Sequence, residues 1–176
     1  IPGSIGGAVI MNSGCYDNDI SKIIISINVL DKKKMIEKEI KKENINFFYR
    51  GTDLSSDLII LSAKLRCSSG KKIEIEEKQN NLLERKKLSQ PSQVKTCGST
   101  FKNISEDKKA WKLIKESGCS NFREGDAVIS QKHCNFFVNN GLAKSKDIEN
   151  LMKKVQKRVY AETGVNLELE IKIIGE

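Results

Sequence analysis

Apolar residues along the first seventy positions follow patterns that are typical of β-strands. The run at 23–30 is rich in isoleucine and ends at an aspartate and three lysines, which predicts a strand followed by a turn. A second, more polar strand is expected at 35–40. The run at 58–67 passes from continuous apolar residues to alternation, as in a strand that leaves a buried sheet. The first third of the chain is therefore expected to be rich in β-structure.

The pattern changes to mixed helices and strands after this region. Residues 74–88 are strong helix formers without glycine or proline, and the Gln-Pro pair at 90–91 ends this charged helix, which we interpret as a connector. A further helix is expected near 108–116. Short strands are expected at 127–129 and 135–139.

The strongest helix signal spans 145–163, where apolar residues recur at intervals of three or four. These residues are Ile148, Leu151, Met152, Val155 and Val159. We expect Ser145 to cap this helix and Gly164 to end it. After it, apolar and charged residues alternate over 167–174, which predicts a final strand.

The composition is that of a globular, water-soluble chain, with 38% hydrophobic and 31% charged residues among 176. No apolar run approaches the roughly 18 to 20 residues that a membrane-spanning helix needs. The first residues lack the basic and apolar blocks of a secretory signal, and because they also lack a methionine we expect the chain to begin inside a longer polypeptide. Five cysteines without a CxxC pair favour reduced thiols in a cytoplasmic protein and no metal site.

The formal net charge of +8 favours an anionic partner. Many lysines stand in runs, such as 32–34, which are typical of solvated faces. The chain has no RNP-type aromatic signature and no helix-turn-helix spacing, so a nucleic-acid partner is disfavoured. A nucleotide or diphosphate ligand remains compatible with the charge.

The densest chemistry lies at 98–103, with the sequence GSTFKN. A glycine, a serine, a lysine and an asparagine follow one another in what we expect to be a single turn, where the glycine would let a ligand approach the backbone. Taken alone, the stretch is better interpreted as an ordinary polar turn.

Two further segments have alternative interpretations. The glycine-rich residues 1–14 would let backbone amides approach a phosphate or a flat ring, although they fit neither GxGxxG nor a P-loop, and a turn-rich connection is slightly favoured. At 47–51, Arg50 follows three aromatic residues. It would either form a planar fork for a carboxylate or phosphate, or lay its stem over the rings, and the two interpretations are about equal.

His133 is the only histidine of the chain. A structural role is the usual one for such a residue, and contact with a diphosphate alongside Lys132 suits its position better than a proton relay, because no carboxylate stands nearby in the sequence. Glu168 and Glu170 lie on the polar face of the expected final strand, where surface carboxylates are the default interpretation.

Seven blocks, read in order, resemble the UDP-N-acetylenolpyruvoylglucosamine reductase (MurB) family of flavoenzymes, which complete UDP-N-acetylmuramate in peptidoglycan synthesis. The blocks are IPGSIGGAVIMNSG at 1–14, FFYRGTD at 47–53, QP at 90–91, GSTFKN at 98–103, AWKLIKESG at 110–118, EGDAVISQKHCNFFVN at 124–139 and ELEIKIIG at 168–175. The resemblance covers nearly the whole chain. It is to the short type of this family, which lacks a tyrosine-bearing insertion.

The resemblance implies an α+β fold in three parts. Residues 1–86 would form part of a vanillyl-alcohol-oxidase-type (PCMH-type) FAD-binding domain, 87–165 a smaller α/β substrate-binding domain, and 166–176 a strand that returns to the FAD side. The family's first FAD-binding segment does not occur in this sequence, so we expect weak FAD binding. Asp126 stands where the family often has glycine, and a different backbone is expected there.

The resemblance also implies a cytoplasmic, monomeric reductase of UDP-N-acetylglucosamine enolpyruvate that uses FAD and NADPH. Hydride would pass from reduced FAD to C3 of the double bond, and C2 would be protonated. Three residues match the family's catalytic groups: Arg50 would hold the substrate carboxylate, Glu170 would stabilise the enolic intermediate, and Ser99 would protonate C2. A non-catalytic fragment that binds a nucleotide sugar or another anion is the alternative.

The resemblance assigns two further sets of residues. Those that would contact FAD are Gly3, Ser4, Gly6, Gly7, Asn12 and Gly14. Those that would contact the UDP-sugar are Tyr49, Lys102, Asn103, Lys132 and His133. Neither a nucleic acid nor a membrane is expected as a partner.

Overall fold

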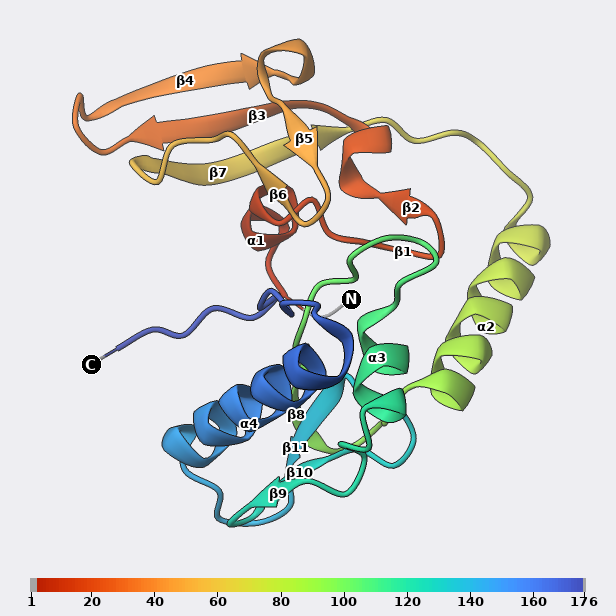
Figure 1. The fold of residues 1–176 in the computed structure, drawn as a ribbon. Coiled ribbons are helices and arrows are strands. Elements are labelled where there is room, and N and C mark those ends of the chain that lie inside the picture. Colours follow the sequence, from red (N-terminus) through yellow and green to blue (C-terminus); the bar gives the residue numbers. More distant parts are fainter. Residues whose placement is uncertain (1–2, 176) are drawn as a thin grey trace. The chain divides into compact units, whose positions relative to one another are not determined.

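The computed structural model of the chain describes residues 3–175 and divides into two compact units, Ile1–Gly70 and Lys71–Glu176 (Figure 1). The first two residues of the expected FAD-contact segment and the last residue of the expected final strand lie outside the described residues. The functional boundary expected at residue 86 falls inside helix α2 (Lys72–Ser89), whereas the compact units divide between residues 70 and 71.

A three-stranded antiparallel sheet of order β4-β3-β7 forms the centre of the first unit. Its strands are β3 (Ile24–Asp31), β4 (Ile36–Lys41) and β7 (Leu58–Leu65). The three strands expected in this region are confirmed, with ends that differ by at most two residues. Their β-branched side chains fill the core on one face of β3, where Val29 is fully buried.

Short elements that the sequence analysis did not predict precede β3 or connect β4 to β7. They are α1 (Ile5–Ile10), β1 (Gly14–Cys15), β2 (Asn18–Asp19), η1 (Ile20–Lys22), η2 (Lys42–Asn44), β5 (Phe47–Phe48) and β6 (Gly51–Thr52). Val9 of α1 is fully buried in the core of this unit, which fixes the glycine-rich segment as a short helix. The turn-rich connection expected there is therefore only partly right.

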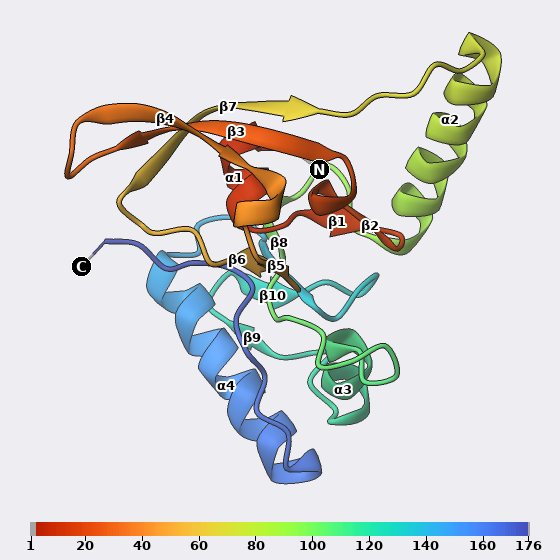
Figure 2. The ribbon, with the colours of Figure 1, turned by 90° about the horizontal axis from the view of Figure 1, so that it is seen from above.

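The second unit contains a four-stranded antiparallel sheet of order β8-β11-β10-β9, with two helices packed on it (Figure 2). The elements are β8 (Lys95–Ser99), α3 (Ala110–Glu116), β9 (Arg123–Glu124), β10 (Ala127–Ile129), β11 (Phe136–Asn139) and α4 (Ser145–Thr163). The helices predicted here and the strands predicted at 127–129 and 135–139 are confirmed. Strands β8 and β9 are additional. The charged helix α2 of this unit has no buried residue, as expected of a connector.

Helix α4 packs against the sheet through the apolar stripe that its sequence predicts. Leu151, Val155 and Val159 are fully buried, and each such side chain contributes roughly 1.5 to 3 kcal/mol by leaving water. The expected end at Gly164 is confirmed, since its φ of 68° lies in the left-handed region. The expected cap at Ser145 is wrong. Helix α4 starts there, and the amide of Lys144 is satisfied by the carboxylate of Asp147 at 2.8 Å.

The final strand predicted at 167–174 is wrong as an element. Leu169 forms an isolated antiparallel bridge with Phe101, and among the described residues no longer ladder continues from it. Leu167 is buried in the core of the second unit, whereas Ile174 is 91% exposed. Only the first apolar residues of this alternating pattern are therefore buried. A strand needs a partner along its whole length, and among the described residues none lies beside the later ones.

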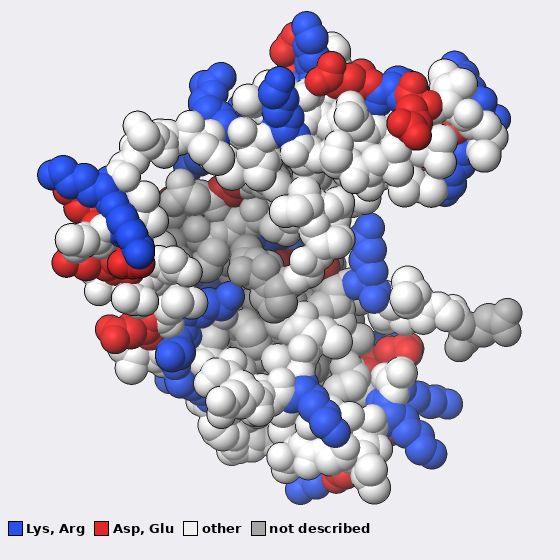
Figure 3. Space-filling model, turned by 180° about the vertical axis from the view of Figure 1, so that it is seen from behind, with Lys and Arg blue, Asp and Glu red and all other residues white. Residues whose placement is uncertain are grey.

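The charged residues of both units are mixed rather than sorted by sign. On the face shown in Figure 3, lysine and arginine side chains stand among aspartate and glutamate side chains. The lysines at 32–34 are exposed, as a solvated run should be. No described helix has both the length and the apolar character that crossing a membrane requires.

Candidate functional site

The segment 98–103 is extended, which corrects the single turn expected from its composition. Ser99 is the last residue of β8 and pairs with Phe136 of β11. Gly98 has a φ of 87°, and no atom lies within 4 Å of the position that a Cβ would take there. The glycine thus fits both the conformation and the open approach that the sequence analysis assigned to it.

One buried amide holds this segment in place. The side chain of Asn135 accepts a hydrogen bond from the backbone nitrogen of Phe101 at 2.9 Å and donates one to its carbonyl oxygen at 2.8 Å. The carbonyl oxygen of Asn135 also accepts a bond from the amide of Thr100 at 2.8 Å. The oxygen and the nitrogen of this side-chain amide, which is 3% exposed, are therefore both used to fix the backbone next to Ser99.

The C-terminal segment pairs with the same backbone. Glu170 donates its amide hydrogen to the carbonyl oxygen of Thr100 at 2.9 Å, and Lys102 donates its own to the carbonyl oxygen of Glu168 at 2.8 Å. Two of the three predicted catalytic residues, Ser99 and Glu170, are thus held one position apart across an antiparallel bridge. Both side chains are partly buried.

Two of the predicted substrate contacts make structural contacts within the second unit. The ammonium group of Lys102 lies 2.6 Å from a carboxylate oxygen of Glu168, in an ion pair that is partly buried only on the lysine side. The side-chain oxygen of Asn103 accepts a hydrogen bond from the amide of Ala110 at 3.0 Å, at the start of α3. The surface position predicted for Glu168 is confirmed, and its carboxylate additionally pairs with Lys102.

Arg50 occupies the second position of the two-residue turn between β5 and β6, with a φ of 57°. Its guanidinium carbon lies 4.9 Å from the centre of the Tyr49 ring, and one guanidinium nitrogen donates to the carbonyl oxygen of Gly14 at 3.1 Å. The charged group thus lies over an aromatic ring while one edge is hydrogen-bonded. Arg50 belongs to the first unit, and its convergence with Ser99 and Glu170 stays a prediction.

A pocket of about 290 Å³ in the first unit contains Arg50. The other residues that line it are Asn12, Asp19, Ser21, Phe47, Phe48 and Tyr49. The buried Asn12 donates to the carbonyl oxygen of Phe48 at 3.1 Å and accepts from the amide of Ser21 at 3.2 Å, so its side chain shapes this pocket.

The glycine-rich residues assigned to FAD differ in the space around them. A Cβ on Gly14 would lie 2.3 Å from the carbonyl oxygen of Asn18, so this glycine permits the close β1–β2 pairing. Ser4 caps α1 by accepting the amide hydrogen of Gly7 at 3.1 Å. Gly6 faces Ile60 at an ordinary contact distance. Gly3 has open space on its Cβ side, where a ligand would meet bare backbone.

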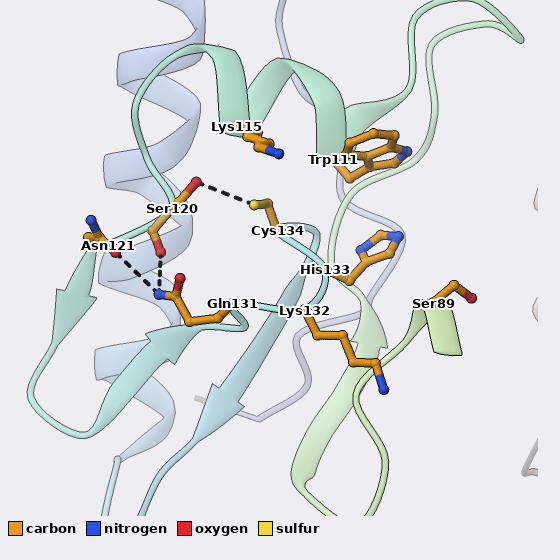
Figure 4. Close-up of a pocket in the computed structure, with 9 residues that line it drawn as sticks. All are labelled: Ser89, Trp111, Lys115, Ser120, Asn121, Gln131, Lys132, His133 and Cys134. Carbon is orange, nitrogen blue, oxygen red and sulfur yellow. Dashed lines mark hydrogen bonds between the residues drawn. The ribbon is translucent and has the colours of Figure 1, made fainter. Parts of the chain in front are cut away.

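The second unit has a pocket of about 630 Å³ beside the loop between β10 and β11 (Figure 4). It is lined by Ser89, Trp111, Lys115, Ser120, Asn121, Gln131, Lys132, His133 and Cys134. The two adjacent residues predicted to contact a diphosphate, Lys132 and His133, both line it. Lys132 also donates a hydrogen bond from its ammonium group to the carbonyl oxygen of Lys87.

His133 is held as a neutral ring in the wall of this pocket. Its centroid lies 6.2 Å from that of Trp111 and 4.8 Å from that of Phe136, and its Nδ1 accepts a hydrogen bond from the amide of Asn135 at 3.3 Å. The proton of the neutral ring therefore resides on Nε2. Burial lowers the pKa of His133 below the value of 6.5 for a free imidazole.

We expect the imidazole signals of His133 to titrate with a midpoint below pH 6.5 in the folded chain and near pH 6.5 in denaturant. Because the folded pKa is the lower one, the folded chain binds fewer protons than the unfolded chain, and this residue weakens folding as the pH falls below 6.5. A proton NMR titration measures both midpoints without assignment, since the chain has one histidine. A folded midpoint at or above 6.5 would contradict the buried, neutral ring.

Comparison with known proteins gives the context of these residues. Residues 90–174 match the family model described as the C-terminal domain of UDP-N-acetylenolpyruvoylglucosamine reductase. The chain is 44% identical over 176 residues to the UDP-N-acetylenolpyruvoylglucosamine reductase of Pelagibacter ubique, covering 99% of this chain and 58% of that protein. The chain belongs to the UDP-N-acetylenolpyruvoylglucosamine reductase family.

Two other reductases of this family show the same correspondence. The Rickettsia prowazekii enzyme is 42% identical, over 100% of this chain and 59% of its own length. The crystal structure of the Thermus caldophilus reductase superposes with a TM-score of 0.86 at 32% identity, over 98% of this chain and 60% of that one. The chain thus spans about three fifths of the length of these relatives and shares the mixed α+β fold of the matching part.

Residues that the sequence analysis did not select also line the site. The sequence analysis treats Asn135 only as the start of a strand, and Trp111 only as part of the block at 110–118. Gln131 and Asn121 drew no interpretation. The sequence offers one signal for the role of Asn135, which is a polar residue at the start of an apolar strand. Its partner Phe101 is 34 positions away, so no local pattern shows the contact.

Proposed function

We propose that this chain carries catalytic residues of a reductase that converts UDP-N-acetylglucosamine enolpyruvate to UDP-N-acetylmuramate in peptidoglycan synthesis, with FAD as cofactor and NADPH as electron donor. The observation that supports this most is the hydrogen bond from the amide of Glu170 to the carbonyl oxygen of Thr100, the residue next to Ser99. It brings together two segments that are far apart in sequence and that are matched to roles at one double bond. Membership of the reductase family supports the same reaction. On this proposal the protein is a cytoplasmic monomer.

The proposed functional domains differ from the two compact units in their boundary, which lies inside α2. Residues 1–86 would belong to a vanillyl-alcohol-oxidase-type FAD-binding domain and 87–165 to a substrate-binding domain, with 166–176 returning to the FAD side. The pairing of the C-terminal segment with Thr100 and Lys102 ties the start of this return to the substrate-binding domain. The cationic pocket at Lys132 and His133 lies in the same domain.

The first unit offers a surface that fits part of a flavin. Gly3 and Gly7 are exposed and carry no side chain, and Ile5 beside them is 54% exposed, so a flat ring could lie against backbone and apolar surface. Ser4, Asn12 and Gly14 are occupied by contacts within the unit. Their proposed contacts with the cofactor are therefore through the backbone. When bound, FAD supplies the hydride that C3 of the substrate receives.

Three residues of the chain would stabilise the negative charge and supply the proton at the reacting double bond. The permanently charged guanidinium of Arg50 would hold the substrate carboxylate and offset the negative charge that develops between C2 and that group. Glu170 would be either protonated or hydrogen-bonded through the substrate in the reactive state, because two unprotonated carboxylates side by side would repel each other. The hydroxyl of Ser99 would pass its proton to C2.

A serine hydroxyl is a weak acid, so its proton transfer depends on position and on a field that stabilises the alkoxide. Position is supplied by Asn135 and the pairing of β8 with β11. Lys102 would contribute a positive field, which its ion pair with Glu168 reduces. We therefore assign Lys102 a lesser part than Arg50 in this proposal.

A second candidate function is non-catalytic binding of a nucleotide sugar or another anion. It is favoured by the pocket in the second unit, which combines two lysines with exposed aromatic surface and does not depend on the first unit.

The absorption spectrum of the purified chain after incubation with FAD and removal of unbound flavin distinguishes the two functions. The reductase predicts a retained flavin band that NADPH bleaches and the enolpyruvyl sugar restores. A colourless chain that still binds the UDP-sugar supports the binding function and contradicts the reductase for this chain. The same measurement with UDP-N-acetylglucosamine, which has no double bond to reduce, is the control.

A further inference from the structure

Three hydrogen bonds tie the hairpin that carries Arg50 to the glycine-rich segment at 10–14. They join the side-chain nitrogen of Asn12 to the carbonyl oxygen of Phe48 at 3.1 Å, a guanidinium nitrogen of Arg50 to that of Gly14 at 3.1 Å, and the hydroxyl of Thr52 to that of Ile10 at 3.3 Å. All of these groups lie in the first unit. The hairpin of β5 and β6 is therefore placed by a segment that contains two of the residues matched to FAD contacts.

Asn12 is the buried member of this set, with 6% of its surface exposed. Its side-chain oxygen accepts the amide hydrogen of Ser21 at 3.2 Å while its nitrogen donates to Phe48, so both ends of the amide are used. Its φ of 40° lies in the left-handed region, which asparagine adopts more readily than most residues. The position thus suits both the backbone preference and the amide of asparagine.

The turn that contains Arg50 is held on both sides. Tyr49 and Arg50 are its two central residues, and Phe48 and Gly51 pair with each other across it. A Cβ on Gly51 would lie 2.2 Å from the ring of Phe48, so this ring lies directly on the backbone of the residue that follows Arg50. Phe48 is thus held by Asn12 at its carbonyl oxygen and by Gly51 at its ring, and its position sets where the turn begins.

The acceptor of the guanidinium group is fixed as well. A Cβ on Gly14 would lie 2.3 Å from the carbonyl oxygen of Asn18, because β1 and β2 pair closely there. The carbonyl oxygen that takes the hydrogen bond from Arg50 therefore belongs to a closely packed pair of strands. The segment 10–14 thus holds Arg50 at two points, its backbone turn and its guanidinium group.

We propose that Asn12 is a positioning residue for Arg50, and that its hydrogen bond to the carbonyl oxygen of Phe48 sets the turn so that the guanidinium group meets the carboxylate of the enolpyruvyl sugar. Asn12 and Arg50 line the same pocket of about 290 Å³. A guanidinium group binds a carboxylate best through two parallel hydrogen bonds, so a small displacement of the turn would lose one of them. The inference rests on the proposed function, because Arg50 holds this carboxylate only in the reductase. It gives the side chain of Asn12 a role apart from any contact of its backbone with FAD.

Isothermal titration calorimetry of the whole FAD-loaded protein, with oxidised flavin and without NADPH, tests the proposal. The two ligands are the enolpyruvyl sugar and UDP-N-acetylglucosamine, which lacks the carboxylate that Arg50 would hold. Asn12→Gly removes the amide and suits the positive φ. It is expected to weaken binding of the enolpyruvyl sugar about 10- to 100-fold, up to the effect of a misplacement of about 1 Å, and to leave UDP-N-acetylglucosamine binding within about twofold.

A double-mutant cycle shows whether Asn12 acts through Arg50. Arg50→Met alone should weaken the enolpyruvyl sugar at least as much as Asn12→Gly does, and should spare UDP-N-acetylglucosamine. In the Arg50→Met background, Asn12→Gly should weaken the enolpyruvyl sugar by no more than about a further twofold, because no guanidinium group is left to position. An asparagine that only supports the fold would cause the same loss in both backgrounds.

Ser26→Ala is the matched control. Ser26 is 4% exposed in the same unit, and its hydroxyl donates to a carboxylate oxygen of Glu39 at 2.6 Å, so this variant also loses a hydrogen bond of a buried side chain. Ser26 is not among the residues that line the pocket of Arg50. The variant should lower the unfolding midpoint and leave both affinities unchanged.

Several results would overturn the positioning role. Unchanged enolpyruvyl affinity in Asn12→Gly, an equal loss for both sugars, an equal loss with and without Arg50, or a selective loss in Ser26→Ala would each do so. If Arg50→Met weakens the enolpyruvyl sugar selectively and Asn12→Gly does not, the reductase proposal stands and this inference alone fails. If Arg50→Met has no selective effect, Arg50 does not hold the carboxylate, and the role that the proposed function gives it fails together with the inference.

Discussion

Replacing Ser99 by alanine is expected to leave the reduction of flavin by NADPH unchanged and to slow its reoxidation by the enolpyruvyl sugar about 10²- to 10⁴-fold, the usual contribution of a positioned acid. The substitution removes only the hydroxyl. The backbone of residue 99 still pairs with Phe136, and Asn135 still holds Phe101, so the segment keeps its shape. Stopped-flow absorbance of the flavin band in the whole protein measures the two half-reactions separately.

Ser92→Ala is the matched control for this experiment. Ser92 is an exposed serine of the same segment of chain and lies outside β8, so its loss should affect neither half-reaction. Ser99→Cys, which retains an acidic hydrogen at the same atom position, should keep part of the reoxidation rate. If Ser99→Ala slows both half-reactions to the same extent, Ser99 affects the flavin or the fold and is not the proton donor.

The elements that the sequence predicted correctly are those whose buried residues follow a repeat within the element itself. Helix α4 repeats its apolar residues every three or four positions and buries them against one sheet, so the pattern and the structure agree. The segment at 167–174 shows an equally regular alternation but has only Phe101 as a bridge partner. Alternation states which side chains would share a face, and it does not state whether another strand is present beside them.

The candidate site was predicted in part for a similar reason. Ser99 and Glu170 were selected by resemblance, and the amide of Glu170 bonds to the carbonyl oxygen of Thr100, the residue that follows Ser99. The amide that holds this backbone, Asn135, was missed because its partner is 34 positions away and its type is common at turns. Trp111 was missed because an aromatic residue in a helix is more often part of the core, whereas here it is 39% exposed at a pocket.

Asn135→Ala is expected to lower the free energy of unfolding by roughly 2 to 6 kcal/mol, because it leaves a buried N–H and a buried C=O of Phe101 without partners at about 1 to 3 kcal/mol each. Guanidinium unfolding followed by circular dichroism measures the shift in midpoint. Asn140→Ala is the control, since Asn140 is exposed and is bonded through its backbone only, and it should change stability by less than about 0.5 kcal/mol.

Asn135→Asp separates the two hydrogen bonds that this amide makes. A carboxylate there still accepts from the N–H of Phe101, but it faces the carbonyl oxygen of Phe101 with a second acceptor in place of a donor. Burial and this repulsion raise the pKa of the introduced carboxyl above its unfolded value, so the loss of stability relative to the asparagine should be smallest at acid pH and grow as the pH rises. A loss that does not depend on pH would mean that the bond to the carbonyl oxygen contributes little. In that case the acceptor half of the amide, which holds the N–H of Phe101, would be the part that positions Ser99.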